Sequence, residues 1–255
     1  MFLQEMKWPE VDALDREKVI AVACISALEQ HSIHLPVSTD YLIGSEIVRR
    51  LERELPRTLL CLPPLWLGCS SHHMDFAGTI SISVETMSRL LQDIVASVMK
   101  HGFRKLLILN SHGGNRATLG YTIQAIGHSY PKSLILGATY WDLVNKELWE
   151  ARETEFGGMG HACELETSIL LSIAPDLVDL SKAEPDGMTL SESKFGRNEM
   201  LSSASVAVYK TFAETSRHGG HGDPRSASAE KGERFLQIIT AGVKSLCDDM
   251  LAGKI

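Results

Sequence analysis

A buried strand that leads directly into metal-binding side chains is the feature that most constrains this chain. Residues 19–25 form a continuous apolar run rich in β-branched side chains, which predicts a strand buried on both faces. Glu29 and His31 follow it and lie two residues apart, so in extended backbone their side chains project to the same side. Asp40 begins the next helical pattern, where a carboxylate is favoured. These donors predict a site for Zn²⁺, Mn²⁺ or Fe²⁺; the alternative is a helix-capping Asp beside a solvated Glu and surface histidines.

The same alternation of apolar runs and helical patterns continues along the chain. Further strands are expected at residues 58–62, 105–109 and 134–139, with one more near 206–209. Helices are expected at residues 40–55, 84–101, about 116–128, 161–173 and 227–251, with a short helix or arm near 8–12. Residues 142–160 look irregular. Apolar strands that alternate with helices predict an α/β fold with a mostly parallel sheet covered on both faces.

Composition predicts one domain over residues 1–255 and argues against several classes of function. The 25 Lys+Arg and 32 Asp+Glu give a net charge of −7 and are scattered, whereas a nucleic-acid-binding protein shows a basic face. No apolar run approaches the ~20 residues of a membrane span, and residues 1–10 lack the pattern of a signal peptide. The five cysteines are odd in number and form no Cys-x-x-Cys pair, which favours free thiols in a reducing compartment. We therefore expect a cytoplasmic protein with no nucleic-acid or membrane partner.

Polar side chains follow the other predicted strands as well. A loop at residues 68–79 carries clustered histidines, and His112 stands between a strand end and two glycines. Because ligands gather at the carboxyl ends of parallel strands, these side chains are expected to share one site with the residues after the first strand. His161 and Glu164 are three residues apart at a predicted helix start and are expected on one face, although Glu164 could instead be a cap. Glu166 is expected to point elsewhere, as a cap or as an acceptor that supports a ligand.

Four motifs in this order resemble the creatininase (creatinine amidohydrolase) family. The family pattern reads Glu-Gln-His-Gly-Pro-His-Leu-Pro…Thr-Asp, a His…Phe-Pro-Gly-Thr loop, Asn-Gly-His-Gly-Gly-Asn, and His-Ala-Gly-Glu-x-Glu-Thr-Ser. The matching segments of this chain are residues 29–40, 73–79, 110–115 and 161–168, and residues 222–232 look like a late loop of the family. The resemblance covers nearly the whole chain.

The resemblance implies a three-layer α/β/α fold, two divalent ions (Zn²⁺, Mn²⁺ or Fe²⁺) and hydrolysis of an amide-like C–N bond in a small molecule. It also implies a homo-oligomer, often a hexamer. Glu29 and His112 would hold one metal and His31 the other, with Asp40 as the bridge and His161 as a proton shuttle. The residues expected to contact substrate are Ser70, His73, Gly113, Gly114 and Asn115. Those expected to support the ligands from behind are His34 and Glu166.

Departures from creatininase itself shape three further expectations. Gly113-Gly114 stands where creatininase has Tyr-Glu, and Gly157 stands where it has Trp, so negligible turnover of creatinine is expected. Glu164 occupies a position that is apolar in creatininase, so it is expected to replace the missing second-metal carboxylate and to act in catalysis beside His161.

Two other classes of protein stay as alternatives. A serine or cysteine hydrolase is disfavoured because the sequence has no Gly-x-Ser-x-Gly elbow and Cys69 and Cys163 lack a defined triad. A noncatalytic metal- or ligand-binding protein that retains the fold is the other alternative.

Overall fold

A parallel sheet forms the centre of the molecule. The computed structural model describes residues 1–188, 195, 199–202 and 206–255, and within them the sheet has the strand order β2-β1-β3-β4. The strands are β1 (Ile20–Ile25), β2 (Leu59–Cys61), β3 (Lys105–Asn110) and β4 (Leu134–Thr139). All neighbouring strands run parallel, and β1 and β3 pair over their full lengths. The apolar runs therefore predicted these strands correctly, to within two residues at each end.

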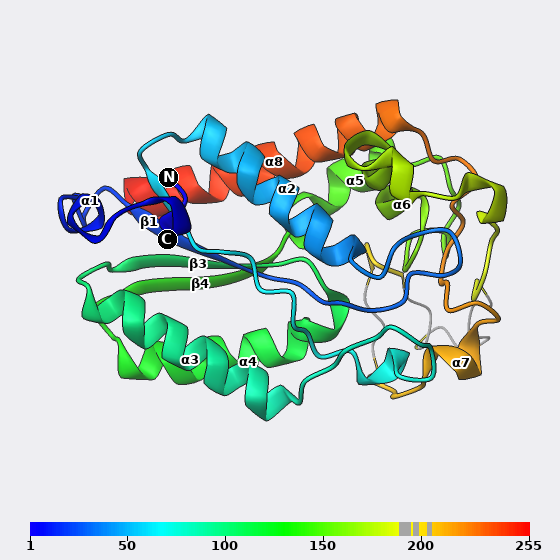
Figure 1. Ribbon diagram of the computed structural model, residues 1–255, viewed down its shortest axis with the longest axis horizontal. Coiled ribbons are helices and arrows are strands. Elements are labelled where there is room, and N and C mark those ends of the chain that lie inside the picture. Colours follow the sequence, from blue (N-terminus) through cyan, green and yellow to red (C-terminus); the bar gives the residue numbers. More distant parts are fainter. Residues whose placement is uncertain (189–194, 196–198, 203–205) are drawn as a thin grey trace.

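Helices cover both faces of this sheet (Figure 1). They are α1 (Trp8–Asp12), α2 (Thr39–Glu54), α3 (Val84–Lys100), α4 (Arg116–Ser129), α5 (Asn145–Ala151), α6 (Glu164–Ile173), α7 (Phe212–Thr215) and α8 (Ala229–Ala252). Alternate side chains of β1 enter two separate cores, because successive residues of a strand face opposite ways. Val22 packs in the core with α2, α6 and α8, whereas Ala21 packs in the core with α3 and α4. The expected three-layer α/β/α architecture is confirmed.

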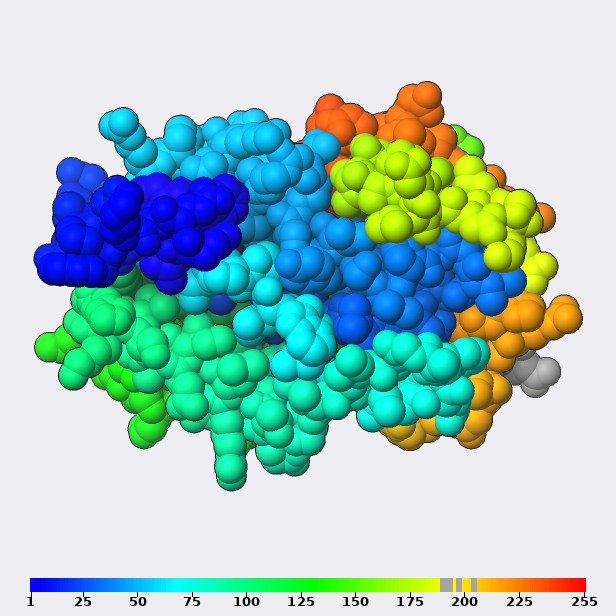
Figure 2. All heavy atoms as spheres, in the orientation of Figure 1, coloured from blue at the N-terminus to red at the C-terminus, as the bar shows by residue number. Residues whose placement is uncertain are grey.

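The N-terminal segment lies beside the edge strand β2. Phe2 forms a parallel bridge with Cys61, and the Cys61 amide donates a 2.9 Å hydrogen bond to the carbonyl of Met1. Figure 2 shows this segment in dark blue at one end of the molecule. It gives the backbone of β2 hydrogen-bond partners that an open sheet edge would lack.

The order of the strands fixes where a ligand site can form. The chain passes from β1 to β2 through α2 on one face, then returns past β1 to β3 through α3 on the other face. The direction of winding thus reverses between β1 and β3. At such a reversal the loops after the two strands diverge to opposite faces and leave a crevice at their carboxyl ends.

Two expectations about local structure were wrong. Residues 142–160 contain a 3-10 turn at Asp142–Val144 and the helix α5. This helix buries only Leu148 and Ala151, and two buried residues are too few to show a helical period in the sequence. Residues 206–209 form no strand. Val206, Val208 and Tyr209 are 53–74% exposed, so their alternation has no neighbouring strand or core to stabilise it.

No helix in the described part of the chain has both the length and the apolarity needed to cross a membrane.

Candidate functional site

Histidines and carboxylates gather at the crevice between β1 and β3, toward the end of the sheet where α7 lies in Figure 1. Glu29 and His31 follow β1, His112 follows β3, and Asp40 lies in the first turn of α2. The other members of the cluster come from η2 (Ser71–His73), from the segment before α6 and from α6 itself: His72, His73, His161 and Glu166. Glu29, His31, Asp40 and His112 are each at most 3% exposed. The structure thus brings together donors that are up to 137 positions apart, counted from Glu29 to Glu166.

Asp40 stands between two histidines, one at each of its oxygens. Nε2 of His31 lies 3.3 Å from Oδ1, and Nδ1 of His112 lies 3.1 Å from Oδ2. Nδ1 of His112 is also 3.3 Å from Oε1 of Glu29. Among the described residues, three overlapping triplets place one donor atom each within 4.8 Å of one another: Glu29/His72/His112, His31/Asp40/Glu166 and Glu29/His31/His161. The first two triplets have the size of two adjacent metal sites.

Backbone carbonyls determine which nitrogen of each neutral imidazole faces the cluster. A carbonyl oxygen only accepts, so Nδ1 of His31 carries the proton and donates to the carbonyl of Glu29 at 3.1 Å. Nε2 of His112 likewise donates to the carbonyl of Cys69 at 3.2 Å. The lone pairs of His31 Nε2 and His112 Nδ1 are therefore directed at the carboxylates, as in metal-binding histidines whose other nitrogen is anchored.

Three buried polar atoms of the cluster lack a hydrogen-bond partner. They are Oε2 of Glu29, Nε2 of His31 and Oδ2 of Asp40. The neighbours of His31 Nε2 and Asp40 Oδ2 lie at ion-pair distance but without hydrogen-bond geometry. Unpaired buried polar atoms are costly, and cations between these groups would satisfy all three. Mixed imidazole and carboxylate donors suit Zn²⁺ and Mn²⁺, so the residues fit divalent metal ions.

The electrostatics of the cluster indicate the same need for positive charge. Burial raises the pKa of Glu166 to about 7, with a further contribution from the Asp40 carboxylate. Burial acts to lower the pKa of His112, but the Glu29 and Asp40 carboxylates outweigh it and hold that pKa well above its ordinary value. The carboxylates of Glu29, Asp40 and Glu166 are so close together that they cannot all be charged without a compensating cation, whether a proton or a metal ion.

The structure contradicts the expected position of Glu164. Its carboxylate is fully buried but accepts hydrogen bonds from the backbone amides of Glu153 and Thr154, at 2.9–3.1 Å, and from Nζ of Lys231 at 3.0 Å. The expectation assumed that His161 lies within the helix. α6 begins only at Glu164, and Ala162 has φ 54°, so residues three apart here do not share a helical face.

Glu166 lies in the cluster instead. It forms a triplet with His31 and Asp40, and its Oε2 also accepts the amide of Ala162 at 2.6 Å. The expected acceptor function of Glu166 is thus present, but the same carboxylate also faces the metal-binding groups. Its expected direction, away from the site, was wrong.

Two residues expected to contact substrate have structural roles. Asn115 is fully buried, and its side chain accepts from the amide of Cys69 and donates to the carbonyl of Ser26 and to Oδ1 of Asn110. It ties together the loops that carry the cluster, and its expected contact with substrate stays a prediction. Gly114 lets the backbone pass His112, because a Cβ there would overlap Nε2 of His112 and the carbonyl of Cys69.

Other expected residues lie at or behind the cluster. Nε2 of His73 is 3.2 Å from Oε1 of Glu29. The buried Ser70 hydroxyl is 3.3 Å from Nε2 of His112, so it helps to orient that ring. Gly113 is exposed with open space around it, and its substrate contact stays a prediction. His34 lies behind α6, where Nε2 is 3.0 Å from the Thr167 hydroxyl, and burial lowers its pKa to about 4.

Phe212 at the start of α7 was not anticipated from the sequence. Its ring stacks on His73 with centroids 4.0 Å apart and meets His161 edge-on at 4.9 Å. It also contacts the rings of His72 and His221. A single Phe in a long polar segment carries no periodic signal, so only the tertiary structure identifies it as a cover for the histidines.

A loop beside the cluster is organised by Asp186. Its two carboxylate oxygens accept the amides of Gly187, Arg217, His218 and Gly220 at 2.6–3.2 Å. Desolvation acts to raise the pKa of Asp186, but these four donors outweigh it and hold the pKa below its ordinary value. This carboxylate therefore fixes the segment 217–220 next to the site.

We expect Asp186→Asn to lower the thermal midpoint by about 2–4 °C at neutral pH, for a loss of about 1 kcal/mol. Because the folded pKa lies below the unfolded value of ~3.9, the carboxylate contributes stability above that value and loses it as pH falls through the folded pKa. The difference between wild type and variant in urea unfolding should therefore be constant above about pH 5 and shrink toward pH 3. Asp176→Asn, at an exposed position, is the control. A difference that grows on acidification would contradict this assignment.

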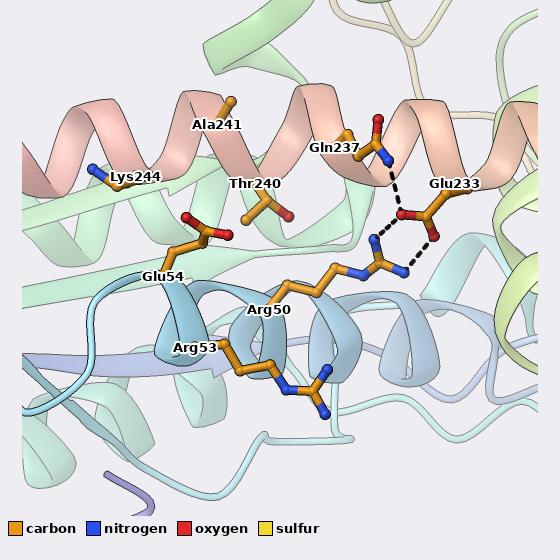
Figure 3. A pocket seen from close by; sticks show the side chains of 8 residues that line it. All are labelled: Arg50, Arg53, Glu54, Glu233, Gln237, Thr240, Ala241 and Lys244. Carbon is orange, nitrogen blue, oxygen red and sulfur yellow. Dashed lines mark hydrogen bonds and ion pairs between the residues drawn. The ribbon is translucent and has the colours of Figure 1, made fainter.

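A hollow of about 580 Å³ between α2 and α8 lies apart from the histidines (Figure 3). It is lined by Arg50, Arg53, Glu54, Glu233, Gln237, Thr240, Ala241 and Lys244. Arg50 donates two parallel 2.7 Å hydrogen bonds to Glu233 and a further one to Glu46. Bidentate pairing of this kind cross-links the two helices, so we assign the hollow a structural role.

Known proteins provide an independent comparison. The family model Creatininase, described as creatinine amidohydrolase, matches residues 4–247. The chain is 26% identical to the creatinine amidohydrolase of Pseudomonas putida over 95% of this chain and 94% of that protein. It is 30% identical to the mycofactocin precursor peptide peptidase of Mycobacterium ulcerans (strain Agy99), over 84% of this chain and 79% of that protein.

Solved structures agree with these matches. The structure from Bacteroides fragilis NCTC 9343 that carries the name of creatinine amidohydrolase superposes with a TM-score of 0.81 at 26% identity, covering 98% of this chain and 96% of the other. A Zn–Zn type of a creatininase variant and a creatininase with Mn superpose with TM-scores of 0.77 and 0.76, at 25% and 24% identity and over 96% of each chain. The sequence motifs, the fold and the matched length agree, and the chain belongs to the creatininase family.

Proposed function

We propose that this protein is a metal-dependent hydrolase that cleaves a C–N amide bond in a small molecule. The observation that carries the proposal is the buried cluster of Glu29, His31, Asp40, His112 and Glu166, in which Glu29, His31 and Asp40 each have a buried polar atom without a hydrogen-bond partner. Such a cluster is costly without cations and suits two divalent ions. The Zn–Zn and Mn structures of family members support divalent metals.

The five residues divide naturally between two ions. Glu29 and His112 would hold one ion and His31 and Glu166 the other, and Asp40 would serve both because its two oxygens face different histidines. Glu166 takes the place for which Glu164 was expected.

The chemistry that such a site supports is hydrolysis. Divalent cations held by these residues would lower the pKa of a bound water and polarise a substrate carbonyl. His161 lies at the edge of the cluster, and its Nδ1 is 3.7 Å from Oε1 of Glu29. We assign His161 the acceptance of the proton from the attacking water and its return to the departing nitrogen. The covering Phe212 ring would limit the access of bulk water to these groups.

Metal analysis combined with a substrate panel tests the proposal. We expect about two Zn²⁺ or Mn²⁺ per chain by elemental analysis, and metal-dependent turnover of at least one member of a panel of small amides, cyclic amides and short peptides. Relatives named for creatinine and for a peptide motivate that choice. Retention of metal without turnover of any member would favour a noncatalytic binding protein. Loss of activity on thiol alkylation with metal content intact would favour a cysteine hydrolase.

We expect negligible hydrolysis of creatinine in that panel. Gly113-Gly114 replaces a Tyr-Glu pair of creatininase, and Gly113 leaves open space where a large side chain would stand. The measurement is the release of creatine from creatinine by the Zn²⁺- and Mn²⁺-loaded protein. A kcat within the usual range of ~1–10³ per second would contradict this expectation.

We expect Phe212→Ala to raise KM about tenfold for whichever substrate is turned over, because loss of an aromatic contact of about 1.4 kcal/mol corresponds to that factor. The ring forms an apolar wall over His73 and His161, and its removal admits water. Steady-state kinetics of Phe212→Ala and the conservative Phe212→Tyr measure the effect. An unchanged KM in the Ala variant would show that Phe212 only supports the loop.

A further inference from the structure

The side-chain amide of Gln30 is held in one orientation by groups on both sides. Its Oε1 accepts the backbone amide of Ser32 at 2.8 Å, and its Nε2 donates to the carbonyl of Gly219 at 2.8 Å. An amide N–H can only donate and a carbonyl can only accept, so a flipped carboxamide would lose both hydrogen bonds. Gln30 is 5% exposed, which makes such a loss costly.

This orientation determines the tautomer of His73. The second N–H of the Gln30 carboxamide is directed at Nδ1 of His73, at 2.7 Å, so Nδ1 must be the unprotonated nitrogen. Neutral His73 therefore carries its proton on Nε2, which lies 3.2 Å from Oε1 of Glu29. His73 is 1% exposed, and none of the three metal-binding triplets found among the described residues includes it. His73 thus presents an N–H group, and not a lone pair, to the Glu29 carboxylate, so we do not count it as a ligand.

The backbone of Gln30 gives His161 the same tautomer, but His161 turns its other ring nitrogen toward Glu29. Nε2 of His161 lies 2.7 Å from the carbonyl oxygen of Gln30, so this nitrogen carries the proton and donates. The lone pair of His161 is thus on Nδ1, the atom that faces Oε1 of Glu29 at 3.7 Å. Gln30 therefore determines that His73 presents an N–H group to Oε1 of Glu29, and that His161 presents an unprotonated nitrogen to the same oxygen.

The two backbone contacts of Gln30 depend on unusual local conformations. Gly219 has φ 84°, and a Cβ at this position would overlap the Gln30 carboxamide. Ser32 has φ 57°, the left-handed region in which the family pattern has glycine. Both turns direct a backbone group at the same side chain, so the backbone on each side maintains the orientation of the Gln30 carboxamide.

We propose that Gln30 is a positioning residue that orients Glu29 through the Nε2–H of His73 and keeps Nδ1 of His161 free to accept a proton. The inference rests on the proposed function, since it concerns the same site. Carboxylates that bind metals are themselves hydrogen-bonded, and loss of the supporting partner costs 10–100-fold in metal affinity or activity. During the reaction one proton would pass from water to His161 Nδ1 and then to the leaving nitrogen, while His73 keeps its own.

Nuclear magnetic resonance tests the tautomers directly. In uniformly ¹⁵N-labelled, Zn²⁺-loaded protein, long-range ¹H–¹⁵N correlation spectra distinguish a protonated from an unprotonated ring nitrogen. We expect the Nε2–H tautomer for both His73 and His161, with the resonances assigned by His73→Phe and His161→Phe. A His73 that carries its proton on Nδ1, or a His161 whose Nδ1 is protonated or bound to zinc, would overturn the proposal.

Two substitutions test the pathway through His73. Gln30→Glu replaces the amide donor by an acceptor, so His73 should switch to the Nδ1–H tautomer and the affinity for Zn²⁺ should fall about 10–100-fold. Gln30→Met removes the donor without adding charge and should give a similar loss of affinity. In a His73→Phe background Gln30→Met should cost little more, because the two residues act in series. Additive losses would contradict action through His73.

Asp186→Asn serves as the matched control for the loop that contacts Gln30. It weakens the anchor of residues 217–220 without touching a histidine of the cluster. We expect it to leave the His73 tautomer unchanged and to change Zn²⁺ affinity by less than threefold, a difference of about 0.65 kcal/mol. Equal losses of affinity in Asp186→Asn and Gln30→Met would mean that Gln30 acts only by holding the loop. Because the spectra and the Zn²⁺ titration need no substrate, failure to find amide hydrolysis would overturn the proposed function and leave this inference standing.

Discussion

Asp40→Asn is expected to remove most bound metal and to abolish catalysis. The substitution keeps the shape of the side chain but removes the negative charge that lies between His31 and His112, 3.3 and 3.1 Å away. Because Asp40 is proposed to bridge both ions, the loss in kcat should exceed the roughly 10²–10³-fold that removal of a single catalytic hydrogen-bond donor costs. The measurements are metal content after gel filtration and kcat at saturating Zn²⁺ or Mn²⁺.

The backbone of Asp40 should keep its structural contact in this variant. Its carbonyl accepts the hydroxyl of Ser111 at 2.9 Å, which the substitution does not alter, so the circular dichroism spectrum should be unchanged. Asp93→Asn, at an exposed position on α3, is the matched control and should retain metal and activity. Two full equivalents of metal in Asp40→Asn would contradict the bridging role.

Glu166→Gln and Glu164→Gln are expected to separate metal binding from stability. Glu166 faces His31 and Asp40, so Glu166→Gln should release or weaken one of the two ions and lower kcat by about 10²-fold or more. Its contact with the amide of Ala162 requires only one acceptor oxygen, which Gln retains, so the fold should persist.

Glu164→Gln should have the opposite profile. The carboxylate accepts two backbone amides and pairs with Lys231 of α8, away from the cluster. Loss of the charge should cost roughly 1–3 kcal/mol of stability and leave both ions bound. Elemental analysis and thermal unfolding of the two variants give the comparison. Full metal occupancy in Glu166→Gln together with metal loss in Glu164→Gln would reverse the assignment.

The amino-acid sequence by itself determined the layers of the fold and the position of the site. Strands buried on both faces must be continuously apolar, so β1 and β3 could be located from the sequence alone. A parallel sheet then brings the loops after β1 and β3 to one edge, which is why Glu29, His31 and His112 could be expected together before any coordinates. The seven-residue helix α5 and the absence of a strand at residues 206–209 escaped this reasoning because neither segment has a decisive hydrophobic period.

Only the tertiary structure decided which carboxylate of α6 faces the histidines. The spacing of His161 and Glu164 suggests a shared face only if both residues are helical, and the helix begins at Glu164 after a residue with φ 54°. The direction of Glu164 is then set by donors outside the helix, the amides of Glu153 and Thr154 and Nζ of Lys231. That of Glu166 is set by the packing of α6 against the loops after β1. The tautomers of His73 and His161 depend likewise on Gln30 and Gly219, which meet only in the folded chain. Local sequence fixes what a residue can donate or accept, whereas its partners are fixed by contacts between segments far apart in the chain.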